Sequence, residues 1–476
     1  MKMLIYCLFI WYSLFTACSS PAKENRAQES KDTVFVEKKK VYENFEKGKV
    51  IDTVYCSNKS GYSFALYLPS TYDPQNKYPS LCLFDPHAKG SLPVKKYKDL
   101  AEKYGFILAC SNNAKNGIIG TKMTEIYTAF LGDIQNRLSV DFKRLYVGGF
   151  SGGARIASSI LLKENGYAGL VGCGAGWMKV KNPLQNKFTY IGFAGNEDFN
   201  LAELRALDAQ LDSKLIPHTL VEFDGKHEWP AAELFEKGFI WLEFDAMKKG
   251  DKPGNDSLIS AFVAEADKEL KLLESKKEWY RLYGLYVRTI AFTEGLTDNT
   301  AYKNAMKTLS EKEEMKETMK AMQDIYLKEE QLKQEYSAYI QSKDEAWWKQ
   351  EMGKFSAIIK SDKDKEIRAM YKRLTAFLSL MAFSNATGAI RFNELSGAQH
   401  FLKVYQVIDP ENPEHAYLYG IVYLRQNMQD KALEYLEKAV KMGFSDYHRL
   451  LTEKDFALMQ TNARFQELVK KAKENQ

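Results

Sequence analysis

The chain has 476 residues, 45% of them hydrophobic, so it is long enough for two or three domains with sizeable apolar cores. Its 67 basic and 62 acidic residues are interspersed, and the net charge of +5 does not indicate a nucleic-acid-binding protein. The overall charge therefore excludes one class of partner, and function has to be sought in local motifs.

Residues 1–18 have the pattern of an export signal. Lys2 supplies a positive charge, and residues 4–15 form an apolar run that is too short to span a bilayer as a stable helix. Small residues precede Cys18, and this ending resembles a bacterial lipobox, in which the cysteine is lipidated and becomes the first residue of the mature protein. We expect a lipoprotein signal peptide, a lipid anchor at Cys18 as the only membrane attachment, and a location in the bacterial cell envelope, on the outer membrane or facing the periplasm. The alternative is an ordinary cleaved signal with an incidental cysteine.

Residues 19–49 are rich in Lys, Glu, Ser, Asn and Gln and contain few large apolar side chains. Such a segment cannot bury enough apolar surface to fold by itself. We therefore expect a flexible tether between the signal and the first domain.

The cysteines give no sign of a metal or redox centre. Four of them follow the signal, at Cys56, Cys82, Cys110 and Cys173, and the last three lie in apolar runs. No pair has the C-x-x-C spacing of such centres, and a free cysteine in an apolar run behaves as a small buried hydrophobe. We expect no metal and no cofactor.

Residues 50–248 alternate between short apolar runs and segments with helical periodicity. Two alternating stretches, residues 50–55 and 63–68, indicate an antiparallel pair at the start. The remainder predicts an α/β domain, with a mostly parallel sheet and helices on both faces. The expected buried strands are residues 80–84, 106–111, 145–147, 170–173, 189–193 and 220–223. The expected helices are residues 95–104, 123–138, 201–215 and 230–247.

A serine between two glycines follows the predicted strand at residues 145–147. The motif is Gly149-x-Ser151-x-Gly153, and helical periodicity begins directly after it. In this context the motif indicates a nucleophile elbow. The glycines are needed because a side chain would clash in so tight a turn, which holds the serine in strained backbone angles. Ser151 is the candidate nucleophile, at the N-terminus of a helix whose dipole favours negative charge.

An acid and a histidine follow the last two predicted core strands. Asp198 comes after the first of these strands and His227 after the second. The carboxyl ends of parallel strands meet at one edge of a sheet, where the chemistry of such folds lies. His227 is the candidate base that takes the proton of Ser151, and Asp198 the candidate acid that orients the imidazole. Glu197 is the alternative acid.

The order Ser, Asp, His and the stretches that carry these residues resemble the α/β-hydrolase family. The resemblance covers residues 50–248 and is strongest to carboxylesterases, feruloyl esterases and polyhydroxybutyrate depolymerase-like esterases, in which Gly-x-x-Asp and Gly-x-His-x-Trp-Pro carry the acid and the base. It implies a serine hydrolase that cleaves a small or polymer-linked ester through an acyl-enzyme. Two alternatives stay open. One is a serine peptidase or amidase, and the other is an inactive hydrolase-like scaffold.

The resemblance also implies an oxyanion hole. One donor is expected to be the backbone N–H of Gly152, and the other an N–H from the loop after the third strand. In that loop Asp85 and Pro86 replace the usual His-Gly pair. Because proline has no N–H, we expect His87 or Ala88 to donate. The alternative is an incomplete hole and weak activity.

Residues 249–256 are rich in Gly, Pro and charged residues and predict a linker that few contacts cross. Strand signals largely stop beyond it, so residues 257–476 predict an all-α domain. Four residues recur there at helical spacing and predict a core face: Met315, Met319, Met322 and Tyr326.

Residues 381–444 resemble two tetratricopeptide repeats of about 34 residues each. The small and aromatic packing positions of the second are Ala416, Gly420, Tyr423, Ala432, Leu436 and Ala439, and those of the first are Ala382, Ala386, Ala398 and Leu402. Two repeats are too few to bury a core, so upstream helices are expected to complete the stack. We expect the repeats to bind a protein partner or to shape the substrate entrance. A generic helical bundle is the alternative.

Overall fold

The computed structural model describes residues 42–177 and 188–475. The expected signal peptide, Cys18 and most of the expected tether lie outside the described residues. The end of that tether, from residue 42 to residue 49, contacts the domain that follows. The backbone N–H of Glu43 donates to the carbonyl oxygen of Arg137 at 3.0 Å, and Arg137 Nε lies 2.6 Å from the Glu43 carboxylate.

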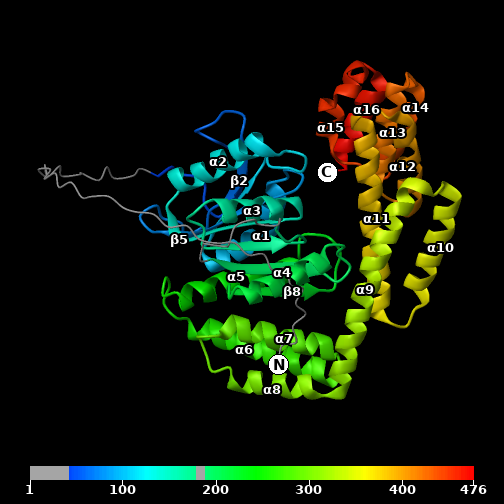
Figure 1. Ribbon diagram of the computed structural model, residues 1–476. Helices are drawn as coiled ribbons and strands as arrows, with labels where there is room; N and C mark the ends of the chain where they lie inside the picture. The colour runs from blue at the N-terminus through cyan, green and yellow to red at the C-terminus, as the bar shows by residue number, and fades with distance from the viewer. Residues whose placement is uncertain (1–41, 178–187, 476) are drawn as a thin grey trace, which may run out of the picture. The chain divides into compact units, whose positions relative to one another are not determined.

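The eight strands form one sheet in the order β1-β2-β4-β3-β5-β6-β7-β8 (Figure 1). The pairs β1–β2 and β2–β4 are antiparallel, and all other neighbours are parallel. The strands are β1 (Val50–Tyr55), β2 (Ser63–Tyr67), β3 (Tyr78–Phe84), β4 (Ile107–Ser111), β5 (Val140–Phe150), β6 (Gly169–Cys173), β7 (Thr189–Gly195) and β8 (His218–Phe223). Only β5 is much longer than predicted, because polar residues in its first half interrupt the apolar pattern.

Helices cover both faces of the sheet, as predicted (Figure 1). Consecutive residues of β5 point to opposite faces. Val147 packs in one apolar cluster with α2, α3 and α4, whereas Tyr146 packs in another with α1 and α5. These helices are α1 (Ser91–Tyr104), α2 (Gly120–Arg137), α3 (Gly152–Lys163), α4 (Leu201–Ser213) and α5 (Ala232–Lys248). The strand order and the two helical layers define an α/β-hydrolase fold.

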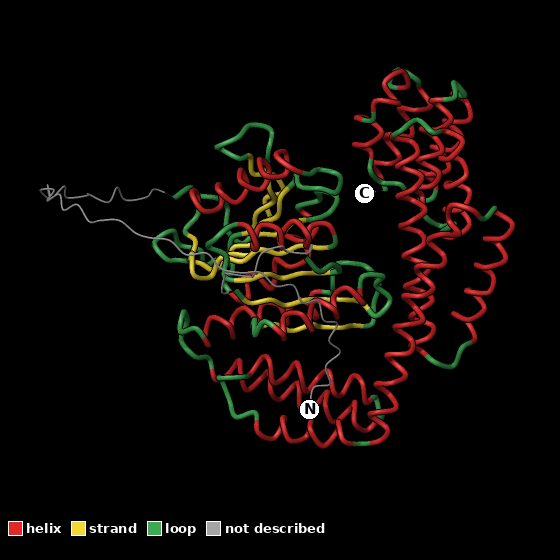
Figure 2. Tube along the Cα trace, viewed as in Figure 1, coloured by secondary structure: helices red, strands yellow, loops and turns green. Residues whose placement is uncertain are grey.

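Beyond β8 the described residues contain only helices and connecting segments (Figure 2). The fold class predicted from the sequence, an α/β-hydrolase sheet followed by an all-helical region, is therefore confirmed. The helices after α5 are α6 (Asp256–Ser275), α7 (Trp279–Thr293), α8 (Thr300–Glu311), α9 (Glu313–Ser342), α10 (Glu345–Ser361), α11 (Lys365–Arg391), α12 (Leu395–Ile408), α13 (Pro413–Arg425), α14 (Gln429–Lys441), α15 (Tyr447–Thr452), the 3-10 helix η1 (Lys454–Met459) and α16 (Ala463–Glu474).

The expectation that few contacts cross the linker at residues 249–256 is wrong. Phe262 of α6 and Phe292 of α7 stack with ring centroids 4.6 Å apart, and both pack against the outer side of α5. There the Trp241 ring lies 5.0 Å from Phe292, and the Phe244 ring lies 5.5 Å from Phe262. Because α5 is apolar on both sides, it needs a second covering layer. The chain from Tyr42 onward accordingly forms one compact unit.

The predicted core face of α9 is also largely wrong. Met315 is buried, but Met319 and Tyr326 are 43% and 38% exposed. The helix is 30 residues long, and its buried hydrophobic residues, Met315, Tyr336 and Ile340, lie towards its two ends. Met315 packs with α6, α7 and α8, and Ile340 packs with α10, α11 and α12. The middle of α9 instead faces α4, where Met322 and Tyr326 line a small crevice.

The helical hairpins α11–α12 and α13–α14 bury the small residues singled out in the sequence. Ala382, Ala398 and Ala416 are fully buried. A Cβ atom on Gly420 would lie 2.7 Å from a methyl group of Leu436, so only glycine allows α13 and α14 to approach this closely. The assignment of these hairpins to tetratricopeptide repeats stays a prediction.

The four cysteines of the described region are free and buried. Burial raises the pKa of the Cys56 thiol to about 11 and that of Cys82 to about 12. No group of three or more His, Cys, Asp or Glu side chains in residues 42–177 and 188–475 is arranged to hold a metal ion. Within the same residues, no helix combines the length and the apolar character needed to cross a bilayer.

We predict that Phe292→Ala destabilises the whole α/β domain, because it opens a cavity between α5 and α7. The expected loss is about 3–5 kcal/mol in the free energy of unfolding, measured by urea denaturation. Leu458→Ala is the control, because Leu458 is 91% exposed. It should change stability by less than about 0.5 kcal/mol. Equal effects of the two substitutions would contradict a shared core of α5, α6 and α7.

Candidate active site

Ser151 is the single residue between β5 and α3. Its backbone angles are φ 51° and ψ −121°, a region that side-chain-bearing residues rarely adopt. The turn is tight because neighbouring backbone leaves no room. A Cβ atom on Gly149 would lie 2.5 Å from the carbonyl carbon of Gly153, and one on Gly153 would lie 1.9 Å from the Phe84 carbonyl oxygen. The two glycines of the motif are therefore required by close approach, as expected from the sequence.

The structure brings Ser151, His227 and Asp198 together. His227 Nε2 lies 2.8 Å from Ser151 Oγ, and His227 Nδ1 lies 2.9 Å from Asp198 Oδ1. The three residues follow β5, β8 and β7, whose carboxyl ends lie at the same edge of the sheet. Glu197, the alternative acid, has its carboxylate 2.6 Å from Lys372 Nζ instead. The hydrogen-bonded chain can pass a proton from the serine oxygen to the imidazole.

The carboxylate of Asp198 is fixed on several sides. Its side chain is 1% exposed, and Oδ1 accepts a second hydrogen bond from the backbone N–H of Asn200 at 2.8 Å. The Asn200 side chain in turn donates to the carbonyl oxygen of Gly174 at 2.8 Å. Burial and the hydrogen bond from Asn200 restrict the carboxylate, whose Oδ1 faces His227.

Two aromatic rings hold the imidazole of His227. The Phe150 and Phe199 ring centroids lie 4.7 Å and 4.3 Å from that of the histidine. Phe150 immediately precedes the serine, and Phe199 immediately follows Asp198. Phe150 and Phe199 thus pack on the imidazole of His227, and this packing restricts rotation of the imidazole.

Of the backbone N–H groups expected to form the oxyanion hole, that of Gly152 is not used within its own helix, whereas those of His87 and Ala88 are used within their own loop. Gly152 lies in the first turn of α3, where backbone N–H groups have no acceptor within the helix. His87, the expected second donor, directs its N–H to Asp85 Oδ1 at 2.9 Å, and Ala88 directs its N–H to the Asp85 carbonyl oxygen at 3.1 Å. Both candidate amides are therefore engaged within their own loop, and neither is directed at the site.

Asp85 accounts for the orientation of the His87 and Ala88 amides. Its side chain is almost fully buried, and Oδ2 accepts a hydrogen bond from Trp229 Nε1 at 3.0 Å. Trp229 lies two residues after His227. Asp85 therefore ties the loop after β3 to the loop that carries the candidate base.

Asn116 lies beside the elbow and was missed in the sequence. Its backbone N–H donates to the Pro86 carbonyl oxygen at 2.8 Å, which holds its loop over the end of β3. A Cβ atom on Gly152 would lie only 1.8 Å from Asn116 Oδ1, so the carboxamide rests against the Cα of Gly152. No sequence motif marks this residue, because it comes from an irregular loop after β4.

A polar cavity of about 530 Å³ lies next to the loops that carry the acid and the base. Its walls come from the ends of β7 and β8 and from α11, and seven of its side chains are charged. They are Glu197, Asp224, Lys226, Glu228, Lys365, Arg368 and Lys372. The helical region therefore reaches the immediate surroundings of the site.

No family model matches the chain, and no curated protein matches it in sequence. Among solved structures, it is similar to a ferulic acid esterase, with 17% identity and a TM-score of 0.35 over 42% of this chain and 98% of the esterase. A fluorophosphonate-binding serine hydrolase of Staphylococcus aureus is 12% identical, with a TM-score of 0.34 over 41% of this chain and 99% of the other. The Bacillus cereus carboxylesterase is 17% identical, with a TM-score of 0.32 over 40% and 96% of the two chains.

Proposed function

We propose that this protein is an exported serine hydrolase that cleaves carboxylic esters through an acyl-enzyme. The observation that carries the proposal is the hydrogen-bonded chain from Ser151 Oγ through His227 to Asp198, with distances of 2.8 Å and 2.9 Å. The strained position of Ser151 at the start of α3 supports it, because that position holds the hydroxyl clear of the chain.

In the first half-reaction, Ser151 Oγ attacks the ester carbonyl carbon while His227 Nε2 takes the hydroxyl proton. The imidazolium then gives this proton to the leaving alcohol oxygen, and the carbon–oxygen bond of the ester breaks. In the second half-reaction, water attacks the acyl-enzyme and transfers a proton to His227, and the proton returns to Ser151 as the acid leaves. Asp198 fixes the tautomer that presents Nε2 as the acceptor and stabilises the imidazolium.

The negative charge on the carbonyl oxygen needs two donors near the elbow. The backbone N–H of Gly152 is the first. The side-chain NH₂ of Asn116 is the second in this mechanism, because the His87 and Ala88 amides donate to Asp85. A half-turn of the Asn116 carboxamide exchanges its oxygen and nitrogen, and this places a donor beside Gly152 without moving the loop.

Ser151→Ala should abolish hydrolysis of a short-chain ester, with a loss of about 10³- to 10⁶-fold in kcat, because the nucleophile is removed. A fluorophosphonate probe should label the parent protein and leave this variant unlabelled. Ser158→Ala is a matched control on the same helix, where the hydroxyl only donates to the Arg155 carbonyl oxygen. An unlabelled and inactive parent would favour the scaffold alternative, and a panel of esters and amides separates esterase from amidase.

Asn116→Ala should lower kcat by about 10²- to 10³-fold with little change in KM, as expected for the loss of one oxyanion donor. Asn116→Asp should lose at least as much, because a carboxylate cannot donate a hydrogen bond. Lys115→Ala changes an exposed neighbour on the same loop and serves as the control. Wild-type kcat in both Asn116 variants would exclude the side chain from the oxyanion hole.

Cys18 is proposed to carry the lipid anchor that holds the protein on the cell envelope. The support is the apolar run that ends in Thr16-Ala17-Cys18. Cys18→Ser should block lipidation and release the protein from the membrane fraction, because each buried acyl CH₂ contributes about 0.8 kcal/mol to membrane binding. Fractionation of expressing cells measures this, and equal membrane association of parent and variant would count against the anchor.

A further inference from the structure

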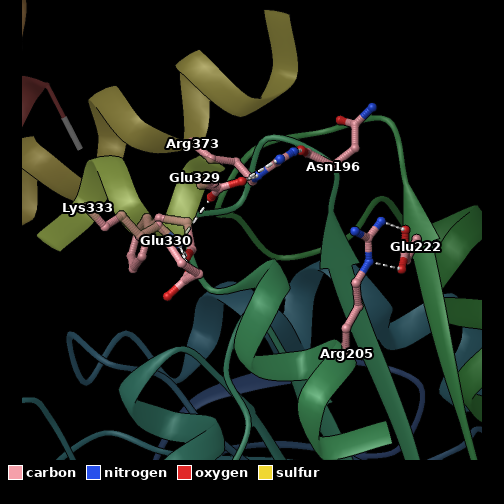
Figure 3. Close-up of polar contacts among 8 residues, drawn as sticks. Asn196, Arg205, Glu222, Glu329, Glu330, Lys333 and Arg373 are labelled. Carbon is pink, nitrogen blue, oxygen red and sulfur yellow. Dashed lines mark hydrogen bonds and ion pairs between the residues drawn. The ribbon is translucent and has the colours of Figure 1, made fainter. Parts of the chain in front are cut away.

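Two helices of the C-terminal region hold the loop that carries Asp198. This loop, residues 195–200, is called the acid loop below. Arg373 Nη1 of α11 donates to the carbonyl oxygen of Asn196 at 2.6 Å, as Figure 3 shows. Lys372 Nζ lies 2.6 Å from the Glu197 carboxylate. The contacts from α11 thus reach the two residues directly before Asp198.

A third contact reaches the residue directly after Asp198. Lys333 Nζ of α9 lies 3.5 Å from the Phe199 carbonyl oxygen. The Phe199 ring packs on the imidazole of His227, as described above. Contacts from α9 and α11 therefore lie on both sides of the candidate acid.

Arg373 is itself held rigidly. The side chain is 6% exposed, and its Nε and Nη2 donate to Glu329 Oε2 of α9 at 2.9 Å and 2.6 Å (Figure 3). The other oxygen of Glu329 lies 3.0 Å from Lys333 Nζ. A buried charge is costly unless it is paired, and here Arg373, Glu329 and Lys333 each have an oppositely charged neighbour, although Glu329 Oε1 accepts no hydrogen bond among the described residues. The pair joins α9 to α11 and fixes the direction of the remaining guanidinium N–H.

The acid loop passes this restraint on to the loop of the candidate base. The Asn196 side chain donates to Asp224 Oδ1 at 2.7 Å and accepts a hydrogen bond from the backbone N–H of Gly225 at 3.2 Å. The backbone N–H of Glu197 donates to the Gly225 carbonyl oxygen at 2.9 Å. Asn196 therefore links the two: its carbonyl oxygen binds Arg373, and its side chain binds the start of the loop that carries His227.

We propose that the buried Arg373–Glu329 pair, with Lys333 and Lys372, positions Asp198 for catalysis. This inference rests on the proposed function, since it requires Asp198 to act on His227. Arg373 touches no reacting atom and is a positioning residue. A misplacement of about 1 Å in a catalytic group can cost about 10²-fold in rate, so a loop that carries such a group needs external restraint. The C-terminal helices supply it here and are part of the catalytic unit.

The test replaces the charged pair by a neutral one. The variant Arg373→Gln/Glu329→Gln keeps polar groups in the buried position but cannot also reach the Asn196 carbonyl. We expect kcat for a short-chain ester to fall by about 10²-fold, with KM within about threefold of the parent. Arg425→Gln/Asp455→Asn is the matched control. Arg425 of α13 also binds a carboxylate through two nitrogens, that of Asp455 in η1. It also donates to a backbone carbonyl, that of Ile390 at the C-terminal end of α11, away from the acid loop. Its kcat should stay within about twofold of the parent.

A cycle with Asp198→Asn separates positioning from general stability. In the Asp198→Asn background, the Arg373→Gln/Glu329→Gln change should cost no further activity, because the group that it positions has lost its function. A further loss of about 10²-fold in that background would overturn the proposal. So would unchanged kcat in the folded Arg373→Gln/Glu329→Gln variant.

Hydrogen exchange gives a readout that does not depend on activity. Amides of residues 196–200 should exchange at least about tenfold faster in the Arg373→Gln/Glu329→Gln variant than in the parent or the control. Equal exchange in the variant and the parent would overturn the positioning role. An inactive parent protein would refute only the proposed hydrolase activity, and the exchange result would still decide whether Arg373 and Glu329 restrain the acid loop. If the double variant does not fold, Lys333→Met/Lys372→Met removes the two flanking contacts and leaves the buried pair. It should show the same directions of change in kcat and exchange, and parental values would contradict the proposal.

Discussion

The hydrogen bond between His227 Nδ1 and Asp198 Oδ1 is the contact on which the arrangement of this site depends. It joins loops from two neighbouring strands, and each loop is tied to further parts of the fold. On one side, Trp229 binds the buried carboxylate of Asp85 and so connects the histidine loop to the loop after β3. On the other side, the acid loop is bound by α9 and α11. The distance from the imidazole to Ser151 is therefore set by elements from most of the chain rather than by the motifs alone.

Close packing around the elbow imposes the second constraint. Gly149 and Gly153 are required because backbone atoms lie less than 3 Å from where a side chain would begin, whereas a side chain at Gly152 would displace the carboxamide of Asn116. The strain at Ser151 persists because this surrounding backbone leaves no alternative path. The carboxamide of Asn116 lies against Gly152, the residue after the nucleophile, and the backbone N–H groups of His87 and Ala88 in the loop after β3 donate to Asp85 instead.

The fold, and the meeting of Ser151, Asp198 and His227 at one edge of the sheet, could be predicted from the sequence because they depend on local patterns. Strand and helix periodicities gave the sheet, and Asp198 and His227 were found because each directly follows a core strand. Contacts between distant segments left no such pattern. Arg373 lies 177 residues from Asn196 and 44 from Glu329, and no sequence pattern near any of the three predicts the pairing.

The sequence did carry a sign that α6 and α7 pack on α5, but it was missed. Trp241 and Phe244 make the side of α5 away from the sheet apolar, and such a side has to be covered by further helices. The sequence also could not show that the backbone N–H of His87, expected to donate to the oxyanion, would instead donate to the Asp85 carboxylate.

A crystal structure of the protein after reaction with a fluorophosphonate would test the central claim, that Ser151 and its surroundings form a working hydrolase site, most directly. We expect phosphorus bonded to Ser151 Oγ and a phosphonyl oxygen about 2.7–3.1 Å from both Gly152 N and Asn116 Nδ2, with Arg373 still bound to the Asn196 carbonyl. An adduct on another residue, or a phosphonyl oxygen directed away from Gly152, would contradict it.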